Sequence, residues 1–218
     1  MEEYRHTLHK GFLMSVADIP SPPTHIGPES NGMMMTSDEY DSIREWDESY
    51  RYELVHGVLI VSPPADPGQR SPNNYLGYMI VTYQENHPNG SVVDDTMDEQ
   101  EIRIGENRRR ADRAIWLGLG RSVHPLNDVP AVAIEFVSRT SRDRHRDYVV
   151  KRGEYAEAGV KEYWVIDRFR RVMTVFRGMD EEIVVKEGGV YETPLMPGFE
   201  LALDRLLSKA DEYKLEDE

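Results

Sequence analysis

The order of apolar and polar residues along the chain predicts alternating strands and helices. Residues 51–62 alternate in polarity on either side of His56-Gly57, which predicts a β-hairpin. A turn-rich loop follows, and apolar residues then recur at helical spacing from about Asn73 to Asn86. Further strands are expected at residues 91–95, 101–104 and 111–117.

The strongest pattern lies at residues 129–167, which read as strand, basic loop, helix and strand. Residues 131–137 are almost all apolar, as in a strand buried on both faces. Residues 143–158 have helical spacing, and Gly159 is a typical residue to end that helix. The next strand, 162–166, should run parallel to the first by the crossover rule.

The remaining segments complete a single domain over residues 36–207, with no internal repeat. Residues 171–177, 182–186 and 190–192 are expected to form an antiparallel ribbon. Thr36 and Glu39 have the spacing of a capping box at the start of a short helix. Residues 1–35 are rich in Pro, Ser, Gly and Met and are expected to be a disordered tail, and residues 208–218 a charged one. We expect an α/β (α+β) fold with a mixed central sheet, an N-terminal hairpin and a C-terminal ribbon.

The composition excludes several classes of protein. The 218-residue chain has no cysteine, so disulfide scaffolds, thiolate zinc sites and cysteine nucleophiles are excluded. No stretch approaches the roughly 20 apolar residues of a membrane span, and the first residues lack the pattern of a signal peptide. We therefore expect a cytoplasmic protein that does not bind membranes.

A formal net charge of −14 argues against binding nucleic acid through the overall field of the protein. Phosphate contacts would need a local basic patch, and the sequence offers two. The first is Arg108–Arg110 with Arg113, expected in a loop that is either simply solvated or in contact with nucleic acid. The second comprises Arg139, Arg142, Arg144, Arg146, Lys151 and Arg152.

Glu135 is the residue most at odds with its surroundings, because a carboxylate within a buried strand needs a cation or a donor. Asp112 lies in a neighbouring predicted strand, and Lys151 borders the inward stripe of the predicted helix. Two carboxylates on adjacent strands form an oxygen site of the kind that Mg²⁺ prefers. A nearby lysine would assist a water or stabilise charge developing on a phosphate. Glu53, in the hairpin, is a fourth candidate.

Each candidate also has a purely structural interpretation. Glu135 could be a buried acid paired with an arginine of the following loop, Arg139 or Arg142. Asp112 could begin a strand and cap a turn, and Lys151 could be a solvated helix residue. Glu53 could lie on the exposed face of the hairpin.

Asp112, followed by Glu135 in AIEFVS, resembles the pattern of the PD-(D/E)XK nuclease superfamily. More closely, the motifs RYELVHGVLIVSPP, AIEFVS, DYVVKRGEYAEAGVKEYWVID and MPGFEL resemble the Uma family of restriction-type endonucleases. The resemblance covers roughly residues 50–207. It implies a restriction-endonuclease-like core, a divalent metal such as Mg²⁺ or Mn²⁺, and DNA as the substrate. On this resemblance Asp112 and Glu135 would bind the metal, Lys151 would be the catalytic lysine, and Glu53 would complete or flank the site.

The sequence departs from the family pattern at three positions. Ala111 stands where the superfamily name has proline, and Val137 stands where the usual lysine of the Glu-X-Lys pair would be. In the family this lysine can move to the following helix, where this chain has Lys151. Relatives often have a histidine in the loop after the hairpin, and this chain has Gln69 and Arg70 there.

Three functions remain open at this point. The first is a metal-dependent DNA endonuclease, for which cutting both strands would need two sites and hence a homodimer, with the ribbon at residues 171–186 as the expected contact. The second is a catalytically silent nuclease fold that serves as a binding or interaction module. The third is a phosphodiesterase that acts on RNA or nucleotides with the same residues.

Overall fold

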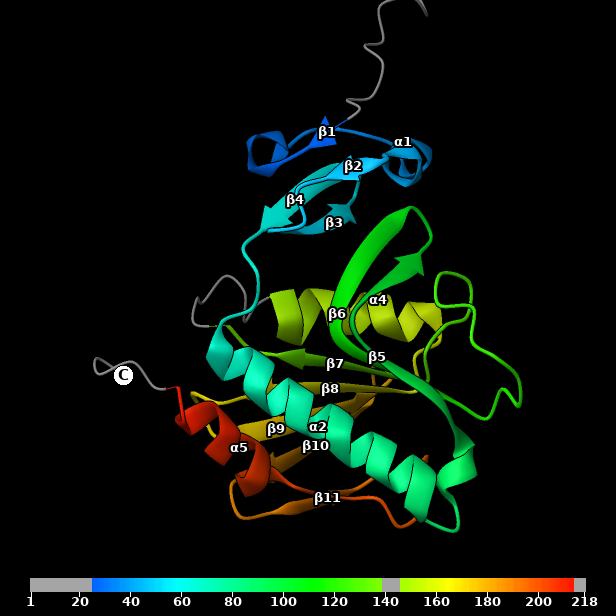
Figure 1. Cartoon of the computed structure of the whole chain (residues 1–218), viewed down its shortest axis with the longest axis vertical. Coiled ribbons are helices and arrows are strands. Elements are labelled where there is room, and N and C mark those ends of the chain that lie inside the picture. The colour runs from blue at the N-terminus through cyan, green and yellow to red at the C-terminus, as the bar shows by residue number, and fades with distance from the viewer. Residues whose placement is uncertain (1–24, 139–145, 214–218) are drawn as a thin grey trace, which may run out of the picture.

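The computed structural model describes residues 25–138 and 146–213, which form three layers around a mixed sheet (Figure 1). The eight strands of this sheet follow the order β10-β9-β8-β7-β6-β3-β4, with β5 paired to β6 outside that path. In chain order they are β3 (Arg51–Val55), β4 (Val58–Ser62), β5 (Val93–Ile104), β6 (Asn107–Leu117), β7 (Val132–Phe136), β8 (Glu162–Asp167), β9 (Val172–Arg177) and β10 (Glu181–Lys186).

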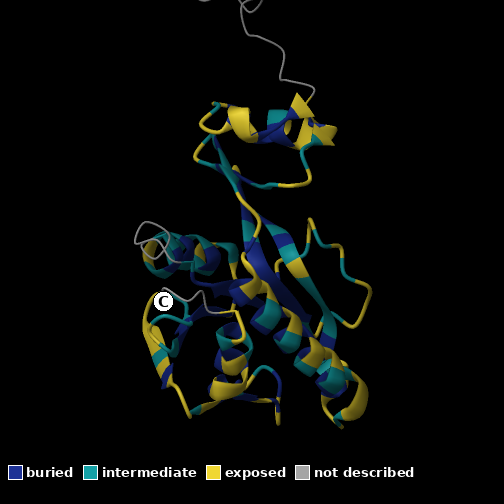
Figure 2. Cartoon of the chain, turned by 60° about the vertical axis from the view of Figure 1, so that its left-hand side comes forward, coloured by how far each residue is buried: buried dark blue, intermediate teal, exposed yellow. Residues whose placement is uncertain are grey.

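Helices cover both faces of the sheet. One face packs against α2 (Pro67–Asn86) and α5 (Leu203–Asp211), through apolar residues such as Leu76 and Leu206. The other face packs against α4 (Lys151–Ala158), through Tyr155. Figure 2 shows the buried residues gathered in the strands and along the inner faces of these helices. The expected mixed sheet flanked by helices is confirmed.

The unit that contains Glu135 also agrees with the sequence pattern. Strands β7 and β8 pair in parallel, and the helix between them ends at Gly159, whose φ of +92° suits a residue without a side chain. The five residues Arg146–Val150 form a π-helical segment, η4, directly before α4. Residues 139–145 fall outside the described ranges, and with them the expected basic loop around Arg139, Arg142 and Arg144.

The expected hairpin is present as β3 and β4, joined by His56 and Gly57, which both have positive φ. These strands belong to an N-terminal module, residues 25–62, that also contains β1 (His25–Ile26), η2 (Pro28–Ser30), α1 (Ser37–Ser42) and β2 (Glu45–Trp46). The module has its own apolar interior, which includes the fully buried Ile26. Thr36 caps α1 in the predicted capping box.

Both expected tail boundaries need correction. Residues 25–35 are ordered against the hairpin, since β1 pairs with β2 and Met35 N–H donates to the Gly57 carbonyl. The tail therefore does not extend to residue 35. At the other end, α5 continues to Asp211, because the buried Ala210 extends the apolar stripe of the helix.

Three other elements differ from the expectation. Residues 91–95 and 101–104 belong largely to one long strand, β5, which follows the short 3₁₀ helix η3 (Gly90–Val92). Helix α2 begins before Asn73. Asp66 is its N-cap, Pro67 is its first residue, and the side chains of Asp66 and Gln69 form a capping box. Strand β11 (Val190–Glu192) pairs with β12 (Glu200–Ala202) and does not join the ribbon of β9 and β10.

The run Arg108–Arg110 is not a solvated loop but part of β6. Arg108 and Arg109 are buried, and each forms an ion pair within the protein. Arg108 Nη2 lies 2.8 Å from Asp41 Oδ2, and Arg109 Nη2 donates to Glu154 Oε1 at 2.8 Å. The expected basic patch at this run is therefore absent, because two of its three arginines are neutralised inside the fold. Within the described ranges, no helix combines the length and the hydropathy needed to cross a membrane.

Candidate active site

The candidate site lies at a fork in the central sheet. Strand β5 pairs along one edge of β6, so β7 and β3 must share the other edge. There β7 pairs with Arg113–Ile115, and β3 pairs only at Arg108. Between these two contacts, residues 109–112 of β6 pair with neither β3 nor β7. Side chains take the place of the missing strand at this point.

The backbone of Arg110 is hydrogen-bonded by two of the predicted residues. Its N–H donates to Glu53 Oε1 at 2.9 Å, and its carbonyl accepts from Lys151 Nζ at 3.0 Å. At the fork the N–H and carbonyl of Arg110 have no strand partner, and buried backbone groups need one. Glu53 and Lys151 supply these partners, which holds both side chains in place. Glu53 comes from β3 and Lys151 from the first turn of α4.

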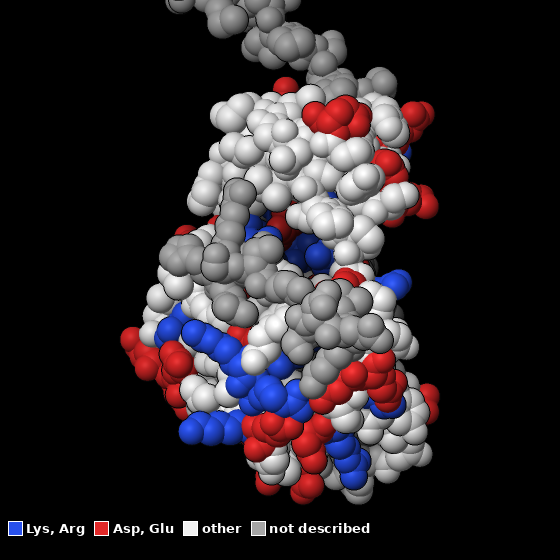
Figure 3. All heavy atoms as spheres, turned by 90° about the vertical axis from the view of Figure 1, so that its left-hand side faces the viewer, with Lys and Arg blue, Asp and Glu red and all other residues white. Residues whose placement is uncertain are grey.

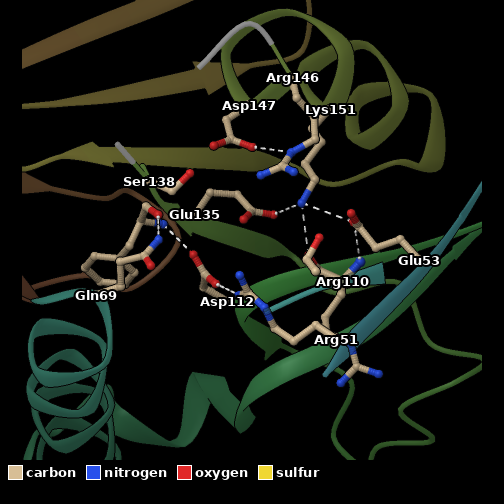
Figure 4. A pocket seen from close by; sticks show the side chains of 12 residues that line it. Arg51, Glu53, Gln69, Arg110, Asp112, Glu135, Ser138, Arg146, Asp147 and Lys151 are labelled. Atoms are coloured by element: carbon tan, nitrogen blue, oxygen red, sulfur yellow. Dashed lines mark hydrogen bonds and ion pairs between the residues drawn. The ribbon is translucent and has the colours of Figure 1, made fainter. Parts of the chain in front are cut away.

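The ammonium of Lys151 lies between two buried carboxylates (Figure 4). Its Nζ is 2.7 Å from Glu135 Oε1 and 3.3 Å from Glu53 Oε1. Tyr155, one turn further along α4, also donates its hydroxyl to Glu135 Oε1, at 3.1 Å. Lys151 has a relative exposure of only 2%, so the alternative of a solvated helix lysine is wrong.

Asp112 is held on both of its carboxylate oxygens. The Phe136 N–H donates to Oδ2 at 2.6 Å, and Arg51 Nη1 donates to Oδ1 at 3.1 Å. Asn73 Nδ2 donates to the Asp112 carbonyl at 2.8 Å. The acid thus bridges β6 to the end of β7, where the two strands separate.

One pocket contains all four predicted residues. Figure 4 shows their side chains converging from β3, β6, β7 and α4. The space between the walls measures about 420 Å³ when the open mouth is included. The pocket is lined by Arg51, Glu53, Ser62, Gln69, Arg110, Asp112, Glu135, Phe136, Ser138, Arg146, Asp147 and Lys151. In Figure 3 the molecule is hollowed beneath the N-terminal module, and acidic and basic side chains are visible there together.

Burial and neighbouring charges perturb the carboxyl group of Glu135. Burial raises its pKa to about 8, with Lys151 acting in the opposite direction and Asp112 adding to the increase. Burial alone would lower the pKa of Lys151, but the surrounding carboxylates, led by Glu135, outweigh it and raise that pKa. The lysine is therefore cationic, and it is the principal charge that stabilises ionised Glu135.

Glu53 shows the opposite balance. Burial raises its pKa, but the charges of Lys151 and Arg109 and the N–H of Arg110 outweigh burial and bring the pKa down to about 2. The two glutamates that contact Lys151 thus differ, because the pKa of Glu53 is lowered and that of Glu135 is raised.

Sequence reasoning missed Arg51 and Asp147, which also line the pocket. Arg51 is the first residue of β3, and its distance of 61 positions from Asp112 hides their contact. Asp147 is almost fully buried in η4, and Arg146 Nε donates to its carboxylate at 3.1 Å. One signal was present, because Asp147 precedes Lys151 by four residues and so lies on the same side of a helix. Gln69 also lines the pocket and donates Nε2 to the Phe136 carbonyl at 2.8 Å.

The donor set suits a divalent cation with hard-oxygen preference. No cluster of three or more His, Asp or Glu ligands is found among the described residues. Mg²⁺, however, commonly uses one or two carboxylates together with waters and substrate phosphate. Asp112 and Glu135 repel each other enough for Asp112 to raise the pKa of Glu135. A cation beside both would relieve that repulsion, so the two residues fit such an ion.

Comparisons with known proteins agree with this fold. The crystal structure of a "putative nuclease belonging to DUF820" from Anabaena variabilis ATCC 29413 aligns with a TM-score of 0.66 over 81% of this chain and 99% of that one. Its sequence identity is 16%, so this likeness establishes the fold alone. No protein of curated function matches the sequence. Residues 37–204, well over half of the chain, match the family Uma2, described as "Putative restriction endonuclease". The resemblance expected from the motifs is thereby confirmed, and the chain belongs to the Uma2 family of restriction-endonuclease-like nucleases.

Proposed function

We propose that this protein is a divalent-metal-dependent endonuclease that hydrolyses phosphodiester bonds in DNA. Asp112 and Glu135 hold Mg²⁺ or Mn²⁺, and Lys151 assists the attacking water. The observation that carries the proposal is the convergence of Asp112, Glu135, Lys151 and Glu53 in one pocket at the fork of the sheet. Family membership supports nuclease chemistry, and the choice of DNA follows from the family description.

Within this proposal the protein supplies a fixed frame for the reaction. The bound cation would supply a Lewis acid and lower the pKa of a nearby water. Lys151 donates hydrogen bonds to Glu135 and to the Arg110 carbonyl and forms an ion pair with Glu53, so its ammonium is held in place while one N–H is left to orient a water or to stabilise charge on a phosphate. Glu53 is the positioning residue for this ammonium, and its lowered pKa keeps it ionised.

Cations within the pocket explain how an acidic protein could accept a nucleic acid. Arg51, Arg110 and Arg146 line it together with Lys151. Local cations act within a Debye length of about 8 Å at physiological ionic strength, so a phosphate inside the pocket meets them before the rest of the surface. The net charge of −14 repels a polyanion, so binding should be weak.

One observation favours the alternative of a catalytically silent binding module. Each proposed ligand already has a cationic partner, Arg51 for Asp112 and Lys151 for Glu135. A site neutralised in this way holds together without a divalent cation. The two functions differ in a single property, which is the affinity of the pocket for the metal.

The test is a calorimetric titration of Mn²⁺ and Mg²⁺, followed by cleavage assays on supercoiled plasmid, single-stranded DNA and RNA. Asp112→Asn and Glu135→Gln should abolish both metal binding and cleavage, since they keep the side-chain volume and remove the charge. Glu157→Gln, an exposed residue of α4, is the matched control and should behave as the unmodified protein. Metal binding with cleavage of RNA alone would assign the site to an RNA phosphodiesterase. Absence of metal binding would overturn the nuclease proposal in favour of the binding module.

A further inference from the structure

The outer edge of β10 is open. This strand ends the path of the central sheet, and among the described strands only β9 pairs with it. The pairing with β9 is regular over all six residues, Glu181 to Lys186, without a bulge. Neither proline nor a bulge protects this edge, although both are common devices against edge-to-edge association. A regular free edge of this length can accept another strand.

The side chains of β10 are self-complementary. Glu182, Val184 and Lys186 share one face of the sheet, because side chains alternate along a strand. In an antiparallel pair related by a twofold axis at Val184, each Glu182 lies opposite Lys186 of the second copy. The two Val184 side chains, each 51% exposed in the single chain, then meet at the centre. The opposite charges and the apolar centre both favour this arrangement.

The neighbouring register lacks these advantages. With the twofold axis at Ile183, Glu182 would face Val184 of the second copy, and Glu181 would face Val185. Charged groups would then lie against apolar ones on both faces. Of these two registers the sequence of β10 favours the one centred on Val184, and self-complementarity of this kind is what a twofold interface requires.

We propose that β10 is the interface of a homodimer, in which two copies of this chain join their sheets antiparallel through β10 in the register centred on Val184. The inference is independent of the nuclease proposal, since no residue of the pocket takes part. It assigns the contact to β10 alone, within the wider ribbon expected from the sequence. The ladder is short, so we expect a dissociation constant in the micromolar range.

A charge swap tests this interface. Glu182→Lys and Lys186→Glu each place like charges opposite one another twice, and each should weaken the dimer by about tenfold or more. The double variant Glu182→Lys/Lys186→Glu restores opposite charges between the two copies and should recover most of the affinity, although it removes the ion pair of Glu182 with Arg152 within each copy. Val184→Lys places two ammonium groups at the axis and should give a monomer. Val81→Lys, the same substitution at a partly exposed valine of α2, is the control and should leave the dimer intact.

The measurement is sedimentation equilibrium across micromolar concentrations, with thermal unfolding by circular dichroism to verify that each variant is folded. Recovery of the dimer in the double variant supports the proposed register. Unmodified protein that remains monomeric throughout would overturn the interface. A dimer that persists in folded Val184→Lys would place the contact elsewhere, and a double variant as weak as the single ones would overturn the register.

Discussion

Glu135 and Glu162 are buried glutamates on adjacent strands of the same sheet, and they illustrate two uses of a buried acid. Glu162 is satisfied on both oxygens, since Arg177 Nε donates to Oε1 at 2.9 Å while Trp164 Nε1 and the Thr193 hydroxyl donate to Oε2. Among the described residues, Glu135 accepts hydrogen bonds from Lys151 and Tyr155 only, both on Oε1, and it lines the pocket. Burial by itself therefore does not mark a site. What distinguishes Glu135 is that its Oε2 accepts no hydrogen bond from the described residues and that the side chain borders the pocket.

The largest effect that separates the two glutamates is on catalysis. Replacing Glu135 by alanine should reduce DNA cleavage by roughly a thousandfold, because loss of a metal ligand removes several kcal/mol of transition-state stabilisation. Replacing Glu162 should leave the rate per folded molecule unchanged. Initial rates of plasmid nicking in saturating Mn²⁺ measure both. Equal losses of cleavage rate in the two folded variants would show that Glu135 has no catalytic role distinct from that of Glu162.

The next largest effect is on the free energy of unfolding, and it is expected for Glu162. Glu162→Ala leaves the donors of Arg177, Trp164 and Thr193 without their acceptor, which should lower the free energy of unfolding by about 3 kcal/mol. Urea unfolding followed by tryptophan fluorescence is the measurement. Burial raises the pKa of Glu135 above its ordinary value, so its charge adds no net stability at pH 7, and Glu135→Gln should change the free energy of unfolding by less than about 1 kcal/mol. A larger loss in the Glu135 variant would make that residue structural.

A third difference concerns how the stability of the fold depends on pH in the acid range. The folded pKa of Glu53 is about 2, below its ordinary value of 4.5. A lowered pKa stabilises the fold at pH above 4.5, and this contribution disappears as the pH falls from 4.5 towards 2. Glu53→Gln should therefore be less stable than the unmodified protein at pH 7, and the difference should vanish near pH 2. Urea midpoints across this pH range test it, and a difference independent of pH would contradict the assignment.

The smallest effect is expected from the hydroxyl of Tyr155. Tyr155→Phe removes one hydrogen bond to Glu135 Oε1 and leaves the ring packed in the core. The loss is about 1 kcal/mol, or roughly a fivefold decrease in cleavage rate. The Mn²⁺ affinity should fall slightly, because Glu135 loses a group that holds its orientation. An unchanged affinity and rate would show that Lys151 alone positions the carboxylate.

The sequence allowed the central unit to be predicted because its signals are local. Glu135 conflicts with the apolar strand around it, and Gly159 marks the end of α4 within the same segment. The partners of Arg108 and Arg109 lie 67 and 45 positions away, so a run of three arginines was mistaken for a loop. Arg51 was missed for the same reason. Contacts between distant segments leave no periodic trace in a single sequence.

The direction of β10 has a consequence for how DNA would be cut. Strand β8 is parallel to β7, while β9 reverses the direction and β10 reverses it again, so β10 runs the same way as β7. An antiparallel joint at β10 therefore turns β7 of the second copy around. The two Glu135 residues then lie towards opposite ends of the joined sheet, on strands that run in opposite directions. Such a dimer would make single-strand nicks at independent positions, and it would not produce paired breaks.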